Sequence, residues 1–393
     1  MTPRAPPETP LAAVTHPNPY PFYAALVEER PLYLDAELGL WVASSARAVG
    51  AVLESARCRV RPVGEPVPTH LRESAAGFVF GRLVRMKDGP AHARLKRAVT
   101  SALCALEEGH LAARSRECAE TLAEATLEPF TAAGLDRFVR ELSVHLTASL
   151  LGLPWPSFES VTRAVEDYVR AVGTPGRESL ADGDVGASTL FTLLGAQLDS
   201  PSRAGLLSQL LLEAGTTPNG RDLVLANAMG FLCQGYEATA GLLGNALLAL
   251  STHPEVAQSL RGTPALLGEV LAEVLRYDAP VQNTRRFVAE SGDVGGVRMA
   301  EGDGILVVLA AANRDPSANA NPHRFEPARK ARRSFGFGAA AHLCPGQALS
   351  FACARAGLAR LLRVGRQLAE VLHDVHYRPS ANVRIPQFGT GGS

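Results

Sequence analysis

The sequence has no excess of charge of either sign, since 39 Lys and Arg residues balance 39 Asp and Glu residues. A neutral chain produces no global field that would attract nucleic acid or an anionic membrane surface. We therefore expect no nucleic acid and no membrane among its partners. Apolar residues make up 46% and charged residues 20%, as in an ordinary globular protein, so the chain can bury a large core.

Cysteine is present, but in none of the patterns that bind zinc or build a disulfide scaffold. There is no Cys-x-x-Cys pair and no short framework spacing, which favours a reducing compartment. Residues 1–18 are rich in Pro and Ala and contain neither a secretory signal nor an apolar run long enough to span a bilayer. We expect a cytoplasmic monomer with residues 1–18 as a flexible N-terminal leader. The six cysteines are Cys58, Cys104, Cys118, Cys233, Cys344 and Cys353.

Internal repeats, low-complexity linkers and blocks of like charge are also missing, so we expect a single domain over residues 19–393. Apolar residues recur at helical spacing from 91 to about 250. Within this region Asp222–Thr252 has no proline and is apolar almost all round, which predicts a buried central helix roughly 45 Å long at 1.5 Å per residue. The predicted fold is mainly α with small β-sheets. Further helices are expected at 21–30 and 346–362, and strands at 32–43, 284–288 and 305–310.

The most informative segment is the loop Phe-Gly-Ala-Ala-Ala-His-Leu-Cys-Pro-Gly at residues 337–346, which leads into the last predicted helix. A helix N-terminus carries partial positive charge and free N–H groups, which lower the pKa of a thiol and can hydrogen-bond a thiolate sulfur. Cys344 is therefore well placed to be an anionic iron ligand. A lone cysteine is more often a small buried hydrophobic residue, which is our interpretation of the other five.

This loop resembles the haem-binding signature of the cytochrome P450 family. The resemblance consists of the aromatic-Gly pair Phe337 and Gly338, the basic residue His342 two before the cysteine, and Gly346 two after it. It implies a cytochrome P450 fold with a long central helix over haem b (iron protoporphyrin IX), and Cys344 as the axial ligand of the iron. The match extends over almost the whole chain, from about residue 19 to about residue 379.

One position in the loop departs from the family's pattern, because Ala340 stands where the family has a second glycine. If the turn there requires a positive φ, the strain costs about 1–3 kcal/mol. A large site that packs against a bound cofactor tolerates such a cost, so we retain Cys344 as the predicted ligand.

Glu273 and Arg276 stand three residues apart on a predicted helix, which places the carboxylate and the guanidinium on one face. Taken alone, they would be a solvated ion pair. The resemblance instead implies a buried structural triad completed by Arg324, which lies in the irregular stretch upstream of the cysteine loop. In that role the three residues hold the loop in place and do not touch substrate.

The two propionates of a haem need cationic or hydrogen-bonding partners where they are buried. His92 and Lys96 lie one helical turn apart, where the family commonly has His and Arg. Lys96 keeps the charge and loses the bidentate geometry of Arg. Arg286 and His342 match the family's remaining propionate partners.

The family's central helix carries, over the haem, a small residue, Gly, any residue, an acid and then Thr. The matching run here is Gln234-Gly235-Tyr236-Glu237-Ala238. Gly235 suits close approach of the backbone to a flat cofactor, and Glu237 suits the acid that relays protons. Ala238 occupies the position of the proton-delivering Thr.

The next residue, Thr239, is a further catalytic candidate, but its hydroxyl does not simply replace the missing one, because it points about 100° further round the helix. Gln234 shares the helix face of Ala238. Our hypothesis is that either Gln234 or a hydroxyl or amide of the bound substrate completes proton delivery. In the alternative, Gln234 only fills space and the enzyme carries out oxidative coupling, dehydrogenation or peroxide-driven oxidation.

The resemblance implies an oxidoreductase that activates O2 to hydroxylate or otherwise oxidise a small organic molecule, in specialised metabolism. Substrate would contact Val281, Gln282 and Asn283. No flavin or nicotinamide fingerprint is found, since 292–296 looks like a turn between strands, so electrons would come from a ferredoxin-type protein with its reductase. A non-catalytic haem sensor is a further alternative, which Glu237 disfavours. The basic residues expected near the ferredoxin site are Arg94, Arg97, Arg329, Lys330, Arg332 and Arg333.

Overall fold

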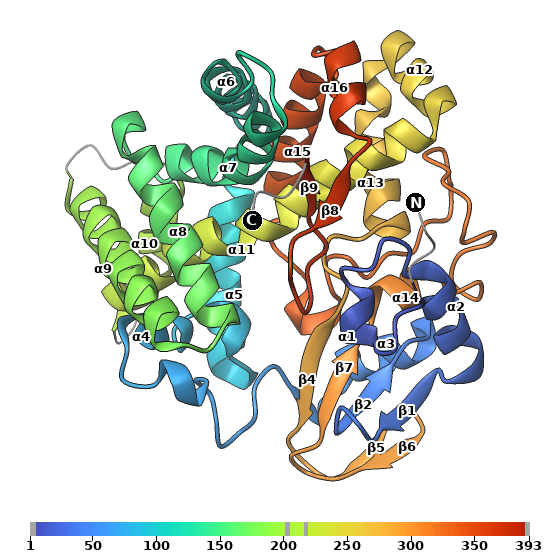
Figure 1. The fold of residues 1–393 in the computed structure, drawn as a ribbon. Coiled ribbons are helices and arrows are strands. Elements are labelled where there is room, and N and C mark those ends of the chain that lie inside the picture. Colours follow the sequence, from blue (N-terminus) through green and yellow to red (C-terminus); the bar gives the residue numbers. More distant parts are fainter. Residues whose placement is uncertain (1–4, 201–204, 216–218, 390–393) are drawn as a thin grey trace.

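The computed structural model describes residues 5–200, 205–215 and 219–389, and is mainly helical with three small sheets. A five-stranded sheet combines strands from residues 32–59 with strands from residues 284–307, in the order β1-β2-β7-β4-β3. It lies below the helical part in Figure 1. Only β2 and β7 pair in parallel. The strands are β1 (Leu32–Asp35), β2 (Leu40–Ala43), β3 (Cys58–Arg59), β4 (Thr284–Val288) and β7 (Gly304–Val307).

Both faces of this sheet are covered, because successive residues of a strand point to opposite sides. Val42 and Leu306, which lie opposite each other in the β2–β7 pair, pack with residues of α1 (Pro10–Ala13) and α2 (Tyr20–Glu29). Their neighbours Ala43 and Val307 face the other way, toward α3 (Ala46–Glu54). The five-stranded sheet is thus a layer that is buried on both faces.

The long apolar segment forms α11 (Gly220–Thr252), a helix of 33 residues that crosses the helical part. It packs against α7, α8, α9, α10, α13 and α15, so the predicted buried central helix is confirmed. The other helices are α4 (Ala75–Phe80), α5 (Gly89–Cys104), α6 (Glu108–Thr126), α7 (Ala132–Leu150), α8 (Phe158–Gly173), α9 (Arg177–Asp199), α10 (Gly205–Ala214), α12 (Pro254–Gly262), α13 (Leu267–Tyr277), α14 (Leu309–Asn313), α15 (Gln347–Leu361) and α16 (Arg366–Val371).

Two short hairpins complete the fold. The predicted turn at 292–296 joins β5 (Gly292–Val294) to β6 (Val297–Met299), with Gly295 and Gly296 both at positive φ. A second hairpin, β8 (Val375–Tyr377) and β9 (Pro386–Phe388), was not predicted. The strand predicted at 305–310 is shorter than expected, because the chain turns into α14 after Val308.

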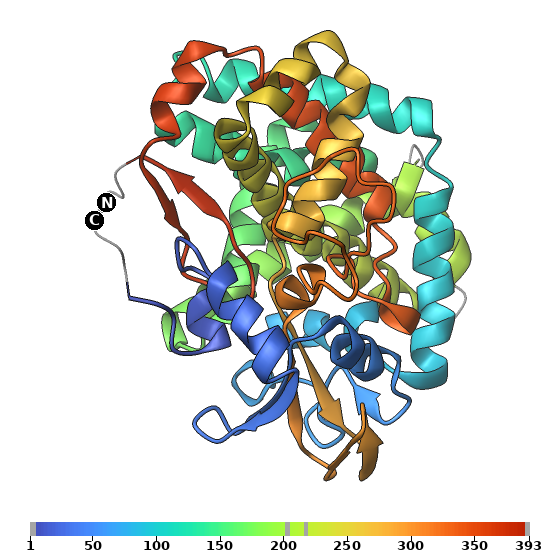
Figure 2. The same ribbon diagram turned by 90° about the vertical axis from the view of Figure 1, so that its right-hand side faces the viewer.

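The N-terminal segment is packed against the C-terminal hairpin, so the expectation of a flexible leader is wrong for residues 5–18. Thr9 caps α1, and Ala13 and Val14 are fully buried. The buried guanidinium of Arg384 donates hydrogen bonds to the carbonyls of Val14, His16 and Pro17 at 2.7–3.1 Å, because a buried charge needs acceptors. Figure 2 shows this dark blue segment beside the red hairpin. Residues 1–4 lie outside the described part.

No helix among the described residues has the length and apolarity needed to cross a membrane.

Candidate active site

The cysteine loop closes on itself ahead of α15. The N–H of Cys344 donates to the carbonyl of Phe337 at 2.9 Å, and the N–H of Gly346 donates to the Cys344 sulfur. Burial raises the pKa of the Cys344 thiol, against the opposing effects of that N–H and of the Lys96 and Arg85 charges. The sulfur is therefore held at a fixed place between a backbone donor and nearby cations, which suits an anionic ligand.

Two residues give this loop its turns through positive φ. Gly338 has φ +73°, and Ala340 has φ +53° at the start of the short helix η5 (Ala340–His342). The positive φ considered for Ala340 from the sequence is thus present. An alanine there carries a left-handed strain that the family's glycine does not.

The middle of α11 is partly exposed within an otherwise buried helix. Gln234, Gly235, Glu237 and Ala238 are all partly accessible, whereas their neighbours toward both ends of the helix are mostly buried. A Cβ placed on Gly235 would meet no atom within 4 Å, so open space adjoins the backbone there. Burial raises the pKa of Glu237, while the charges of Arg378 and Arg85 lower it. Open space beside a glycine is what a flat cofactor requires.

The two polar neighbours of Ala238 both point away from it. Thr239 is 2% exposed, and its hydroxyl lies 3.4 Å from that of Ser350 on α15. The prediction of Thr239 as a catalytic candidate is therefore wrong, because the helical turn directs its hydroxyl into the protein. Gln234 folds back along the helix, since its amide nitrogen would be 2.8 Å from a Cβ on Gly230, one turn earlier.

The predicted propionate partners come together from three elements. The His92 ring on α5 stacks on the His342 ring with centroids 4.2 Å apart, and Lys96 donates to the carbonyl of Leu343. His342 Nε2 lies 3.1 Å from Asp88 Oδ1. Burial, with the His342 and Lys96 charges, lowers the pKa of His92 to about 4, so it is neutral at pH 7.

The fourth predicted partner, Arg286, extends from β4 and is buried. Its Nη1 donates to the carbonyl of Arg285 at 2.8 Å, and its charge interacts with Asp88. Together with Lys96, which donates to the loop carbonyl of Leu343, it adds a second basic side chain to this set. This donor set fits a group with two carboxylates.

The buried pair Glu273 and Arg276 has the predicted structure. Both side chains are 0% exposed and are joined by two hydrogen bonds of 2.7 and 3.1 Å. Arg276 also donates to the carbonyls of Pro322 and Arg324. The pair thus fastens the irregular stretch to α13, as expected.

The third member of the triad was wrongly predicted. The Arg324 side chain is exposed, and only its carbonyl takes part. Arg329 and Arg332 contact Glu273 instead, at 3.3 and 3.0 Å. The backbone turn at residues 321–324 directs the Arg324 side chain outward and brings the later arginines back to α13. Neither Arg329 nor Arg332 is thus free for a redox partner.

Two of the three predicted substrate contacts are occupied by structural roles. Gln282 is 0% exposed and donates to the carbonyl of Ala279, and Asn283 donates to that of Ala381. Both side chains therefore lie within the protein and are wrongly predicted as pocket residues. Val281 remains partly exposed, in a β-bridge with Val383.

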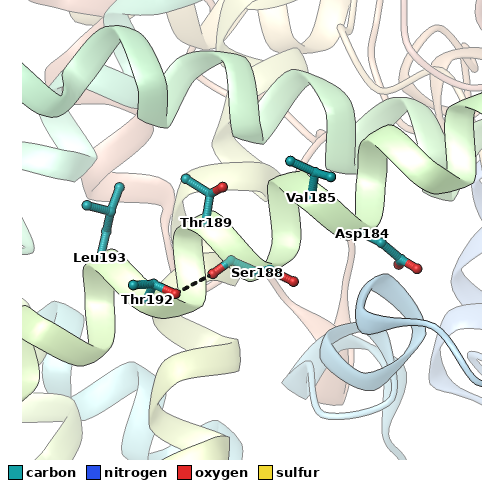
Figure 3. Close-up of a pocket in the computed structure, with 6 residues that line it drawn as sticks. All are labelled: Asp184, Val185, Ser188, Thr189, Thr192 and Leu193. Carbon is teal, nitrogen blue, oxygen red and sulfur yellow. Dashed lines mark hydrogen bonds between the residues drawn. The ribbon is translucent and has the colours of Figure 1, made fainter.

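A hollow of about 540 Å³ lies on α9, and its six lining residues all come from that helix (Figure 3). Thr192 donates to the carbonyl of Ser188 at 2.9 Å, and Asp184 accepts from the N–H of Ala76 at the start of α4. These polar groups serve the helices themselves, so this hollow is not part of the active site.

Sequence reasoning missed two cations that act on Glu237, namely Arg85 and Arg378. The charges of Arg85 and Arg378 both act on Glu237, and that of Arg85 also interacts with Tyr168. The available signal for Arg85 was its place, with Arg82, in the otherwise apolar run Phe-Val-Phe-Gly-Arg-Leu-Val-Arg-Met at 78–86. Nothing local indicates which of the two cations acts on α11.

Comparison with known proteins agrees with this geometry. The family model "Cytochrome P450" matches residues 265–364. The chain is 30% identical over 375 residues to the vitamin D(3) 25-hydroxylase of Pseudonocardia autotrophica, covering 93% of this chain and 92% of that protein. It is 26% identical over 369 residues to the biotin biosynthesis cytochrome P450 of Bacillus subtilis strain 168, covering 92% and 93%. The crystal structure of P450BioI with acyl carrier protein ligated to hexadec-9Z-enoic acid superposes with a TM-score of 0.81 at 25% identity, over 94% of this chain and 97% of that one. The chain therefore belongs to the cytochrome P450 family of haem-thiolate oxidoreductases.

Proposed function

We propose that this chain is a monooxygenase that binds haem b through the Cys344 sulfur. The observation that carries the proposal is the placement of that sulfur, with its Gly346 N–H donor, in a loop closed ahead of α15, together with open space beside Gly235 on α11. His92, Lys96, Arg286 and His342 would hold the propionates. When bound, the haem supplies the activation of O2.

The reaction we propose is hydroxylation or a related oxidation of a small organic molecule in specialised biosynthesis. A relative named as a hydroxylase and another named for biotin biosynthesis support this class of reaction. The protein's own contribution is to exclude water and to hold the substrate near Gly235 and Ala238, with Val281 at the pocket edge.

We assign proton relay to Glu237, because burial raises the pKa of its carboxyl toward the range in which it can take and give a proton. The amide of Gln234 lies one turn away, near Gly230. Of the two ways to replace the missing threonine hydroxyl, this position favours a hydroxyl or amide of the substrate. Gln234→Ala should then leave the ratio of product formed to electrons consumed unchanged, and strong uncoupling would instead assign the role to Gln234.

A ferredoxin-type protein with its reductase is the electron donor we propose. Arg94, Arg97, Lys330 and Arg333 are exposed on the side of α5 and the irregular stretch, where they can steer an acidic partner. We further propose that the enzyme is a cytoplasmic monomer with one domain. Cross-linking or titration with a ferredoxin, at low and high salt, tests the charge contribution.

The first experiment is the absorption spectrum of the reduced, haem-loaded protein with carbon monoxide. We expect the far-red Soret band of thiolate ligation, its loss in Cys344→Ala, and no change in Cys104→Ala, whose thiol is exposed and distant in sequence from the loop. Haem without that band would contradict thiolate ligation and favour the sensor alternative. Failure to bind haem would overturn the proposal.

Ala238 specifically favours a second candidate, an oxidation without oxygen insertion, such as coupling or dehydrogenation. Turnover under isotopically labelled O2 separates the two. Label in the product supports the monooxygenase, and product without label supports the second candidate.

A further inference from the structure

Tyr236, in the middle of α11, is bonded to a side chain of another helix. It is 1% exposed, and its hydroxyl donates to Oε1 of Glu166 on α8 at 2.6 Å. The same oxygen accepts from Nη1 of Arg140 on α7 at 2.8 Å. Burial and then the Glu166 charge raise the pKa of Tyr236 to about 12, so its hydroxyl stays protonated and donates. One carboxylate thus joins three helices.

The two charged members of this cluster stand on helices that are themselves fixed. Both α7 and α8 pack against α11 and against each other (Figure 1). One turn before Arg140, Asp136 accepts from the N–H of Phe388 on β9 at 3.0 Å. The side chains of Arg140 and Glu166 are 33% and 29% exposed, and an ion pair near the surface stabilises little on its own. The buried tyrosine hydroxyl is therefore the member that ties the pair to the centre of the protein.

The turn of α11 around Tyr236 is supported from one side. Tyr236 and Thr239, three residues apart, share the buried face of the helix. Gln234 and Ala238, four residues apart, share a partly accessible face that lies roughly opposite, at about 100° per residue. A Cβ on Gly235 would meet no atom within 4 Å, so the site side supplies no packing contact there. The buried face must therefore hold this turn in place.

The tyrosine makes the shorter of two polar contacts on that buried face. The Thr239 and Ser350 hydroxyls are 3.4 Å apart, which is long for a hydrogen bond between two hydroxyls. The bond of 2.6 Å from Tyr236 has a charged acceptor, and such bonds are about twice as strong as neutral ones. Glu237 follows Tyr236 directly and points about 100° further round the helix. Fixing the direction of the tyrosine therefore fixes that of the acid.

We propose that Tyr236 is a positioning residue, which through its bond to Glu166 fixes the rotation of α11 and with it the direction of Glu237. This inference rests on the proposed function, because it concerns the same site. The Tyr236 hydroxyl does not face the site, since it is bonded to α8. Its loss should alter the α11 side of the site without removing any group that faces it.

The first test uses carbon monoxide bound to the reduced, haem-loaded protein. Cys344 would hold the iron from one side, so carbon monoxide would lie on the α11 side, where its C–O stretching frequency responds to nearby charges and dipoles. We expect the infrared band to shift or split in Tyr236→Phe and in Glu166→Ala. Glu166→Gln, which keeps an oxygen acceptor, should restore much of the wild-type band.

The matched control is Tyr20→Phe. The Tyr20 hydroxyl donates to Asp278 at 2.5 Å, so this variant removes a bond of the same kind, between α2 and the residue that follows α13. It should lower the free energy of unfolding in urea and keep the wild-type C–O band. A wild-type band in Tyr236→Phe would make its hydroxyl a purely structural group and overturn the proposal.

The second test is hydrogen exchange of the backbone amides from 234 to 240, followed by mass spectrometry, which needs no haem. Loss of a hydrogen bond to a charged group should speed this exchange about tenfold or more in Tyr236→Phe, and Tyr20→Phe should leave it unchanged. Tyr236→Phe combined with Glu166→Ala should exchange no faster than the faster single variant, because both changes remove one interaction. Additive effects would refute the link between the two side chains.

The two proposals fail in different ways. The proposed function fails if the wild type lacks the thiolate band, and hydrogen exchange then still decides whether Tyr236 and Glu166 hold this turn of α11. A wild-type exchange rate in Tyr236→Phe would overturn the positioning role, whether or not the thiolate band is present.

Discussion

The Asn227 side chain accepts a hydrogen bond from the backbone N–H of Val84 and donates one to the carbonyl of Arg82. One side chain on α11 thus fixes the backbone on both sides of Leu83 and fastens the loop that precedes α5 to the central helix. The conformation of this loop therefore depends on a buried amide, since Asn227 is 1% exposed.

Asn227→Ala should destabilise the protein and loosen this loop. Removing the amide leaves a buried N–H and a carbonyl unpaired, at a cost of about 1–3 kcal/mol in the free energy of unfolding. Urea denaturation measures the loss. Gln258→Ala, on the exposed side of α12, is the control and should change stability by less than about 0.5 kcal/mol. If Asn227→Ala had the same free energy of unfolding as the wild type, other contacts would hold the loop.

Ala340→Gly should stabilise the protein, because glycine relieves the left-handed strain at φ +53°. The gain is at most about 1 kcal/mol, since the relief of about 1–2 kcal/mol is partly offset by the greater freedom of glycine in the unfolded chain. Ala341→Gly, one residue later and not at positive φ, should have the opposite sign and cost about 0.5–1 kcal/mol. Thermal unfolding of the two variants gives the sign of each change in stability. The same sign for both would refute the strain at Ala340.

Glu273→Ala should be among the most damaging single changes in the chain. It leaves Arg276 buried with an uncompensated charge and removes the partner of Arg329 and Arg332, at a cost of about 3–5 kcal/mol. Arg324→Ala removes only an exposed side chain and should change the free energy of unfolding by less than about 0.5 kcal/mol. Equal losses in denaturant titrations would restore Arg324 to the triad.

The Glu273 carboxylate also predicts that the stability of the protein depends on pH. Burial alone would raise the pKa of Glu273, but hydrogen bonds and charge from Arg276, with further donors, outweigh it, so the folded pKa lies below the ordinary value of 4.5. A lowered folded pKa contributes stability that is fully present above pH 4.5 and is lost as the pH falls toward the folded value. Unfolding free energies measured from pH 7 to pH 3 should fall less steeply in Glu273→Gln than in the wild type. Parallel curves would assign the acid sensitivity to other groups.

Local sequence patterns were sufficient for the features that neighbouring residues determine. The cysteine loop and the absence of proline in α11 are both local, and the angle between Ala238 and Thr239 follows from helix geometry alone. The bond of Thr239 to Ser350 agrees with that angle. These predictions required no knowledge of tertiary packing.

The errors about the site concern the directions of side chains, which tertiary packing determines. Arg324 was chosen over Arg329 because the direction of a side chain in an irregular stretch depends on its turns. Gln282 has the right location but is turned inward, toward the carbonyl of Ala279. Arg85 was missed because its environment is made by α8 and α11, more than 80 residues further along the chain.

The bonds of Arg384 to Val14, His16 and Pro17 have a consequence for synthesis on the ribosome. The carbonyls that it binds are synthesised about 370 residues before their donor. The segment that carries these carbonyls therefore waits for Arg384 before it can reach its final packing. The helix α1 is thus a late element of the fold, although it precedes all the other helices along the chain.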